Sequence, residues 1–226
     1  MKNTSPSLTW REDKVPVSVR FDDPYYSLDN GLAETQHVFL HGNNLPQRFA
    51  HNLHIAELGF GTGLNFIATL QQWRKSKIQG KFHFTSFEAF PMTPADMIKA
   101  YDQFHEISDI AAEVAPHLDA LIATGSLELR DASLTLIIGD ARETLSDWDG
   151  LADCWYLDGF SPAKNPELWE DSLMSVVFEK TNSGGTVAIY TAAGFVRKNL
   201  ENAGFDVKRV QGFGRKRHMC IAKKAP

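Results

Sequence analysis

The feature that most constrains the fold is a glycine-rich turn, Glu57-Leu-Gly-Phe-Gly-Thr-Gly-Leu-Asn65, which directly follows a short apolar run. The run at 54–58 predicts a buried strand, and apolar residues at intervals of three from Leu64 to Trp73 predict a helix after the turn. Glycines let the backbone bend sharply and approach a ligand without an intervening Cβ. In open α/β sheets ligands bind at such strand ends, although a tight turn without a ligand stays an alternative.

Strand and helix patterns alternate along the rest of the chain. Further strands are predicted at 81–87, 127–130, 134–140, 152–157 and 186–192, and helices from Pro94, from about Glu167 to Lys180 and at 195–204. This alternation predicts a parallel sheet covered by helices on both faces. The last two strands, 205–211 and 218–224, leave no room for a crossover helix between them, so we expect an antiparallel edge hairpin. The predicted fold class is therefore α/β.

The domain organisation is predicted from where this regular pattern begins. Residues 51–226 form the main domain, and residues 1–50 form an extension packed on it. In that extension, 21–31 is interpreted as a loop and 34–44 as a segment with a short strand-like centre. A length of 226 residues suits one compact domain with a full-sized core.

Composition excludes several classes of protein. No apolar run approaches the ~18–20 residues of a membrane helix, and the N-terminus carries no signal-like apolar region. Cys154 and Cys220 form no C-x-x-C pair, so we expect two reduced, buried thiols in a cytoplasmic protein. The eight histidines form no H-E-x-x-H or similar set, and we predict no metal site.

The charge is distributed unevenly along the chain. The net charge is −5, but residues 195–226 contain nine Lys or Arg against two acids, which leaves −12 for the first 194 residues. A basic segment on an acidic body is typical of phosphate binding, and a solvated basic face is the alternative interpretation. The loop with Arg215, Lys216 and Arg217 is the densest part of this segment.

Three acids each follow an apolar strand and should lie at the same edge of the sheet. Glu88 stands where a carboxylate accepts the hydroxyl protons of an adenosine ribose, and Asp140 where one receives the adenine amine. Asp158, in Leu-Asp-Gly-Phe-Ser-Pro, suits work on an amine or hydroxyl. The alternatives are an exposed strand-end acid for Glu88, a helix N-cap for Asp140 and a turn cap for Asp158.

The glycine spacing bears on which cofactor is bound. Dinucleotide-binding turns are typically G-x-G-x-x-G, whereas this chain has G-x-G-x-G with Leu64 in place of the last glycine. A nicotinamide-dependent oxidoreductase is therefore disfavoured, although it stays an alternative.

Five separated motifs in order resemble one family. ELGFGTGLNF, SFEAFP, LDGFSPAKNPELW, TAAGFVRKNLENAGF and GFGRKRHMC resemble the methyltransferase domain of the MnmC family, and the similarity runs from about Phe21 to about Ala222. The resemblance implies a class I S-adenosylmethionine-dependent methyltransferase with a seven-stranded sheet. It implies methylation of the primary amine of 5-aminomethyl-2-thiouridine at the tRNA wobble position. It also implies an FAD-dependent oxidase as a fused or separate partner, with no FAD expected in this chain.

The resemblance also assigns roles to individual residues. Asp158 is the acid at the reacting centre, and Glu88 and Asp140 are the cofactor acids. The remaining cofactor residues are Glu57, Gly59, Phe60, Gly61, Thr62, Gly63, Asn65 and Ala141. For tRNA we expect Phe160, Lys164, Arg215, Lys216 and Arg217, with Tyr25, Tyr26 and Tyr190 as unranked stacking candidates. A non-catalytic tRNA-binding module and a methyltransferase acting on another amine are the remaining alternatives.

Overall fold

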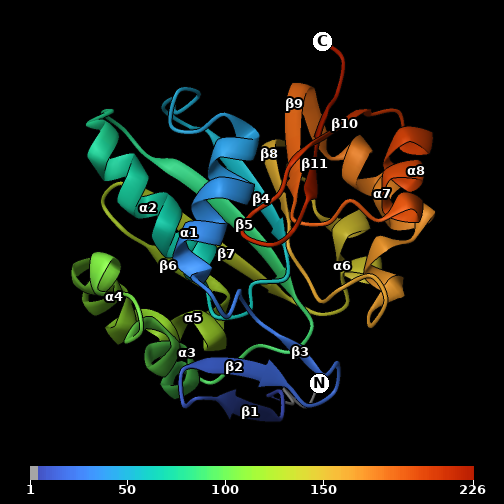
Figure 1. Cartoon of the computed structure of the whole chain (residues 1–226). Coiled ribbons are helices and arrows are strands. Elements are labelled where there is room, and N and C mark those ends of the chain that lie inside the picture. The colour runs from blue at the N-terminus through green and yellow to red at the C-terminus, as the bar shows by residue number, and fades with distance from the viewer. Residues whose placement is uncertain (1–4) are drawn as a thin grey trace.

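A single mixed sheet forms the centre of the computed structural model, which describes residues 5–226; the first four residues of the predicted extension lie outside it. The strands are β4 (His54–Leu58), β5 (Phe82–Glu88), β6 (Ser126–Glu128), β7 (Ala132–Ile138), β8 (Ala152–Leu157), β9 (Thr181–Ile189), β10 (Asp206–Gln211) and β11 (His218–Lys223). Their order is β10-β11-β9-β8-β4-β5-β7-β6 (Figure 1).

The pairing confirms the predicted fold class. Strands β9, β8, β4, β5 and β7 are parallel, and β10 and β11 form the antiparallel hairpin at one edge. The opposite edge carries β6, which pairs antiparallel with β7 and places Leu127 opposite Leu134. Strands were predicted at both positions, and β6 makes the sheet eight-stranded rather than the seven-stranded sheet that the family resemblance implies.

Helices cover both faces of the sheet (Figure 1). One face carries α1 (Gly31–Thr35), α2 (Leu64–Ser76), α3 (Pro94–Tyr101), α4 (Ser108–Val114) and α5 (Leu118–Thr124), and the other carries α6 (Ala141–Asp147), α7 (Asp171–Glu179) and α8 (Gly194–Ala203). Side chains alternate across a strand, so Cys154 and Tyr156 of β8 join the first core while Trp155 and Leu157 join the second. None of the helices between residues 5 and 226 is both long and apolar enough to cross a bilayer.

The N-terminal segment folds differently from its prediction. Strands β1 (Leu8–Arg11), β2 (Val15–Ser18) and β3 (Asp23–Pro24) form a small antiparallel sheet. The strand-like centre predicted within 34–44 is wrong, because α1 continues into a π-helical turn, Gln36–Leu40, and a 3₁₀ turn, His41–Asn43. The Asn30 side chain caps this helix by accepting from Ala33 N at 2.9 Å, and Val38, Phe39 and Leu40 are buried.

Two predicted boundaries also move. The strand predicted at 186–192 begins earlier, since β9 starts at Thr181. Ala152 of β8 pairs with Thr181 and Cys154 with Thr186, so Gly184 and Gly185 lie in an irregular, bulged part of β9. The helix predicted from Glu167 begins only at Asp171, after a 3₁₀ turn, Pro166–Trp169. The helix at Gly194–Ala203 ends, as predicted, at Gly204, whose φ is 116°.

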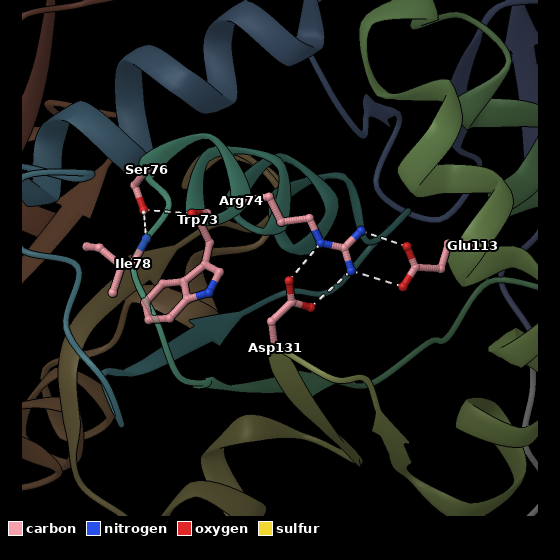
Figure 2. Close-up of polar contacts among 6 residues, drawn as sticks. All are labelled: Trp73, Arg74, Ser76, Ile78, Glu113 and Asp131. Carbon is pink, nitrogen blue, oxygen red and sulfur yellow. Dashed lines mark hydrogen bonds and ion pairs between the residues drawn. The ribbon is translucent and has the colours of Figure 1, made fainter.

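An arginine near the end of α2 joins three elements (Figure 2). Arg74 Nε donates to Asp131 Oδ2 at 2.8 Å and Nη2 to Asp131 Oδ1 at 3.0 Å, at the start of β7. The same guanidinium donates to both carboxylate oxygens of Glu113 on α4, at 2.6 and 2.9 Å. The guanidinium lowers the pKa of Asp131, whose side chain is only 11% exposed. Arg74 therefore fixes the far end of the helix that begins at the glycine turn.

We predict that Arg74→Gln lowers the free energy of unfolding by about 1–3 kcal/mol, because it leaves the Asp131 carboxylate largely buried without its charged partner. Lys81→Gln is the matched control, since Lys81 pairs with Glu128, whose side chain is 64% exposed. That pair should contribute at most ~1 kcal/mol. Urea denaturation of both variants measures the difference, and equal losses would contradict the prediction.

Candidate active site

The predicted site residues meet where the strand order reverses. The chain runs from β4 outward to β5 and β7, and then returns to place β8 and β9 on the other side of β4. Leu58, the last residue of β4, pairs with Phe87 of β5 and with Leu157 of β8. The glycine turn and Asp158 therefore leave neighbouring strands side by side, at the position where open α/β sheets bind ligands.

Close backbone contact explains the first glycine of the turn. A Cβ on Gly59 would lie 2.1 Å from the carbonyl oxygen of Asp158, and the φ of Gly59 is +87°. Any other residue would push β4 and β8 apart at their last pair, where Asp158 N donates to Leu58 O at 3.1 Å. Gly61 has φ +53° and faces the ring of Tyr25. The glycines are therefore required by the packing of the turn itself.

A cavity of about 800 Å³ opens at this edge of the sheet. Most of the predicted site residues line it: Gly59, Phe60, Gly61, Thr62, Asn65, Glu88, Asp140, Ala141, Asp158, Phe160, Lys164 and Lys216. Four predicted residues do not line it: Glu57, Gly63, Arg215 and Arg217. Asp158 and the glycine turn thus face one common space.

The two predicted cofactor acids bind backbone groups. Glu88 Oε2 accepts from Gly61 N at 2.9 Å and Oε1 from Phe90 N at 2.7 Å, so this side chain ties the glycine turn to the end of β5. Each oxygen keeps a further lone pair for a ligand hydroxyl. Asp140 caps α6 by accepting from Arg142 N at 2.9 Å, and its carboxylate also pairs with the Arg142 guanidinium at 2.6 Å. Asp140 is therefore a helix cap that lines the cavity.

A buried polar network lies beneath the cavity. Asn65 Nδ2 donates to Glu57 Oε1 and to Asp158 Oδ2, both at 2.8 Å, and its Oδ1 accepts from the Thr35 hydroxyl at 2.8 Å. The other oxygen of Glu57 accepts from Ser86 Oγ at 2.6 Å. Burial raises the pKa of Glu57 well above its ordinary value. Glu57 is therefore placed under the site, where it supports Asn65 and does not face the cavity.

Among the acids that face the cavity, Asp158 has the most strongly shifted pKa. Burial raises its pKa to about 7, and the negative charge of Glu34 raises it further, whereas the Asn65 hydrogen bond and the charge of Lys216 lower it. A carboxyl group with a pKa near neutrality exchanges protons readily under physiological conditions. This side chain is therefore suited to proton transfer.

Aromatic side chains and two acids of the N-terminal segment cover the cavity beyond Asp158. Phe160 stacks on Phe21 with ring centroids 4.5 Å apart. Ser161 N donates to Asp23 Oδ2 at 2.8 Å, and Lys164 pairs with Asp22 at 3.0 Å. The loop after β8 is therefore fastened to the segment around β3, which forms part of the cavity wall.

Only one of the three basic residues of the β10–β11 loop reaches the cavity. Lys216 lines the cavity and pairs with Glu34 Oε1 at 2.8 Å, whereas Arg215 and Arg217 are exposed and lie outside the lining. Sequence analysis missed Glu34, because it lies in the segment that was predicted to contain a strand. Tyr190, previously unranked, lies at the end of β9 with its ring 4.4 Å from the Lys216 ammonium.

The fold and this site define the class of the protein: a Rossmann-like α/β domain of the class I methyltransferase type, with its cleft at the carboxyl ends of β4 and β8. The model of the S-adenosyl-L-methionine-dependent methyltransferase family matches residues 102–225, and the chain belongs to this family. Its cofactor is therefore S-adenosylmethionine, and the alternative of a nicotinamide cofactor is set aside.

Curated relatives are longer than this chain. It is 43% identical to the tRNA 5-methylaminomethyl-2-thiouridine biosynthesis bifunctional protein MnmC of Aliivibrio fischeri, over 96% of this chain and 34% of that protein. It is 42% identical to the protein of the same name from Caulobacter vibrioides, over 98% of this chain and 39% of that protein. The chain thus spans about a third of the length of the curated relatives it matches.

Solved structures agree with the fold. The crystal structure of MNMC2 from Aquifex aeolicus matches all of this chain and 72% of that chain, with a TM-score of 0.77 and 26% identity. A precorrin-6y C5,15-methyltransferase from Geobacter metallireducens matches with a TM-score of 0.52 and 16% identity, over 96% of this chain and 98% of that chain, and supports the fold alone.

The cavity suits the family's cofactor. The glycine turn presents bare backbone, and Glu88 keeps acceptor positions at the end of β5. Both oxygens of Asp140, after β7, accept from Arg142, so a ligand amine has to displace that side chain. These are the groups that a ribose and an adenine amine require.

Within residues 5–226, no group of three or more His, Cys, Asp or Glu side chains is arranged to hold a metal ion. Both cysteines are buried and free, as predicted.

We predict that Asp158→Asn stabilises the ligand-free protein at pH 8. The folded-state pKa of about 7 lies above the ordinary value of 3.8, so folding favours the protonated acid and stability falls as pH rises from about 4 through 7. The amide carries no charge and avoids this loss, which amounts to roughly 1–4 kcal/mol. Thermal denaturation should show a higher melting temperature for Asp158→Asn at pH 8 and a small difference at pH 4. A lower melting temperature at pH 8 would contradict it.

Proposed function

We propose that this chain transfers a methyl group to the primary amine of 5-aminomethyl-2-thiouridine at the wobble position of tRNA, giving 5-methylaminomethyl-2-thiouridine. The observation that carries the proposal is the position of Asp158, next to the glycine turn in the shared cavity and with a pKa near neutrality. The names of the relatives support the substrate, because they describe biosynthesis of that product nucleoside in tRNA.

The first chemical requirement is removal of a proton from the substrate. A primary alkylamine is largely protonated at neutral pH, and its nitrogen has no lone pair for attack until one proton leaves. Ionised Asp158 accepts that proton and holds the neutral amine by a hydrogen bond. Bound S-adenosylmethionine supplies the activated methyl group. Transfer would break the bond between the methyl group and the sulfonium sulfur and leave S-adenosylhomocysteine, and the amine nitrogen would become a secondary ammonium. Asp158 then returns its proton to solvent.

The second requirement is a fixed carboxylate. Asn65 donates to Asp158 Oδ2, and the Thr35 hydroxyl holds the Asn65 oxygen, so the amide presents its NH₂ group to the carboxylates. The other Asp158 oxygen is left for the substrate. Orientation of this kind contributes to rate because the reacting groups need not search for their geometry.

The third requirement is a surface for tRNA. A wobble base lies in a loop, where it can be splayed out and stacked on aromatic rings such as Phe160 at the cavity. We propose that exposed Arg215 and Arg217 contact anticodon-stem phosphates, with Lys164 as a further cation at the cavity rim. As the family resemblance implies, we also propose that an FAD-dependent oxidase, fused or separate, supplies the aminomethyl precursor.

Nucleoside mass analysis tests the reaction. tRNA that carries the aminomethyl precursor is incubated with the protein and S-adenosylmethionine, and the proposal expects conversion to the methylaminomethyl nucleoside. Asp158→Asn should lower the rate by about 10²–10⁴-fold, and the wild-type rate should fall as pH drops below about 7, because Asp158 becomes protonated. Asp109→Asn, at an exposed position of α4, is the matched control. Turnover by Asp158→Asn close to wild type would remove Asp158 from the mechanism.

The tRNA surface has its own test. Replacing Arg215 and Arg217 together by Gln should weaken tRNA binding and make the slope of log Kd against log salt shallower by about 1.5–2. Lys75 and Lys77, at the end of α2 remote from the cavity, are replaced by Gln in the control variant. Filter binding at several salt concentrations gives both slopes. An unchanged slope for the Arg215 and Arg217 variant would place the tRNA elsewhere.

A further inference from the structure

The Lys216 ammonium is held inside the cavity by two groups from distant parts of the chain. It donates to Glu34 Oε1 at 2.8 Å and lies 4.4 Å from the centre of the Tyr190 ring. Its charge lowers the pKa of Asp158 while that of Glu34 raises it, so both lie close enough to act on this carboxyl group. All four side chains line the same cavity.

The two groups around the ammonium are themselves fixed. Glu34 Oε2 accepts from Ser27 N at 3.0 Å, and its side chain is only 12% exposed. The Tyr190 hydroxyl donates to Gly159 O at 2.8 Å, which holds the ring at the end of β9 beside the Asp158 loop. Lys216, in contrast, stands on a loop, and its side chain is 47% exposed. Hydrogen bonds therefore hold the acid and the ring in place, whereas the lysine reaches them from a partly exposed position on a loop.

The chemistry of this arrangement is that of amine recognition. A carboxylate provides the hydrogen bond and countercharge for an ammonium group, an aromatic face attracts the cation, and a second acid lies nearby. A neutral hydroxyl or a phosphate would gain little from these groups, since the acids repel an anion and the ring prefers a cation.

We propose that Glu34, Tyr190 and Asp158 form a binding site for a primary alkylammonium group, which the Lys216 side chain occupies until the substrate displaces it. This inference rests on the proposed function and extends it, because it assigns the recognition of the amine to Glu34 and Tyr190. Lys216 is then a placeholder for the substrate amine, and its role differs from that of its neighbours Arg215 and Arg217.

The test measures binding of two nucleosides by calorimetry at pH 8, with the full chain saturated with S-adenosylhomocysteine. The probes are 5-aminomethyl-2-thiouridine and 5-methyl-2-thiouridine, which lacks the amine. Wild type should prefer the aminomethyl nucleoside. Lys216→Gln should tighten that nucleoside about 3–10-fold and leave the other unchanged, because the competing ammonium is gone. Glu34→Gln should reduce the preference by about 10-fold or more.

Two controls guard against general effects. Lys99→Gln removes a cation that likewise pairs with an acid, Asp13, and lies 4.2 Å from an aromatic ring, Trp10, but lines no part of the cavity, so it should change neither affinity. The double variant Glu34→Gln with Lys216→Gln removes both members of the ion pair, so neither charge is left without its partner. That variant should still bind the aminomethyl nucleoside with a reduced preference.

Several results would overturn the inference: weaker binding of the aminomethyl nucleoside by Lys216→Gln, an undiminished preference in Glu34→Gln or in the double variant, or no preference in wild type. Methylation of precursor tRNA alongside any of these would leave the proposed function standing. The expected pattern of affinities without methylation of tRNA would instead reject the proposed function and keep the amine site.

Discussion

The close approach of Gly59 to the Asp158 backbone is the constraint on which the rest of the site depends. Because Gly59 has no Cβ, β4 and β8 stay paired to their last residues, and the turn and the acid leave the sheet side by side. The neighbouring strands add Glu88 and Asp140 at the same edge by parallel register. A parallel sheet thus gathers residues that are about a hundred positions apart into one cavity, provided that its central pair is undistorted.

Asn65 then distributes hydrogen bonds between acids that would otherwise repel each other. One amide nitrogen serves both Glu57 and Asp158, and the hydroxyl of Thr35 fixes which way the amide faces. Burial raises the pKa of both acids, so protonation of either one is easier than in water and reduces the negative charge in this low-dielectric site. The N-terminal segment supplies Thr35 from beneath the site and Asp23 from its rim, and is therefore part of the site.

The site residues that could be predicted from the sequence are those whose positions follow from a local pattern. An apolar run that ends in an acid marks a strand end, and the parallel register then forces Glu88, Asp140 and Asp158 onto one edge, which is why these residues were found. Glu34 was missed because capping by Asn30 and burial of the following apolar residues turned a strand-like pattern into helix. Lys216 was grouped with its basic neighbours because composition does not record which way a side chain points.

The ion pairs at the cavity determine the free-energy cost of displacing a side chain when a ligand binds. Asp140 pairs with Arg142 and Glu34 with Lys216, and the two cations are 43% and 47% exposed. The Asp140–Arg142 pair, with both side chains more than a third exposed, contributes about 0–1 kcal/mol, so a ligand group replaces Arg142 at little cost. Glu34 is only 12% exposed, and a substrate ammonium that displaces Lys216 gives this carboxylate a new charged partner. Without Lys216 the Glu34 carboxylate would lie unpaired near Asp158, and the pKa of Asp158 would rise further, because Lys216 lowers it and Glu34 raises it. Partly exposed cations thus pair with the acids of the free protein, and Lys216 lowers the pKa of Asp158 until a ligand ammonium takes its place.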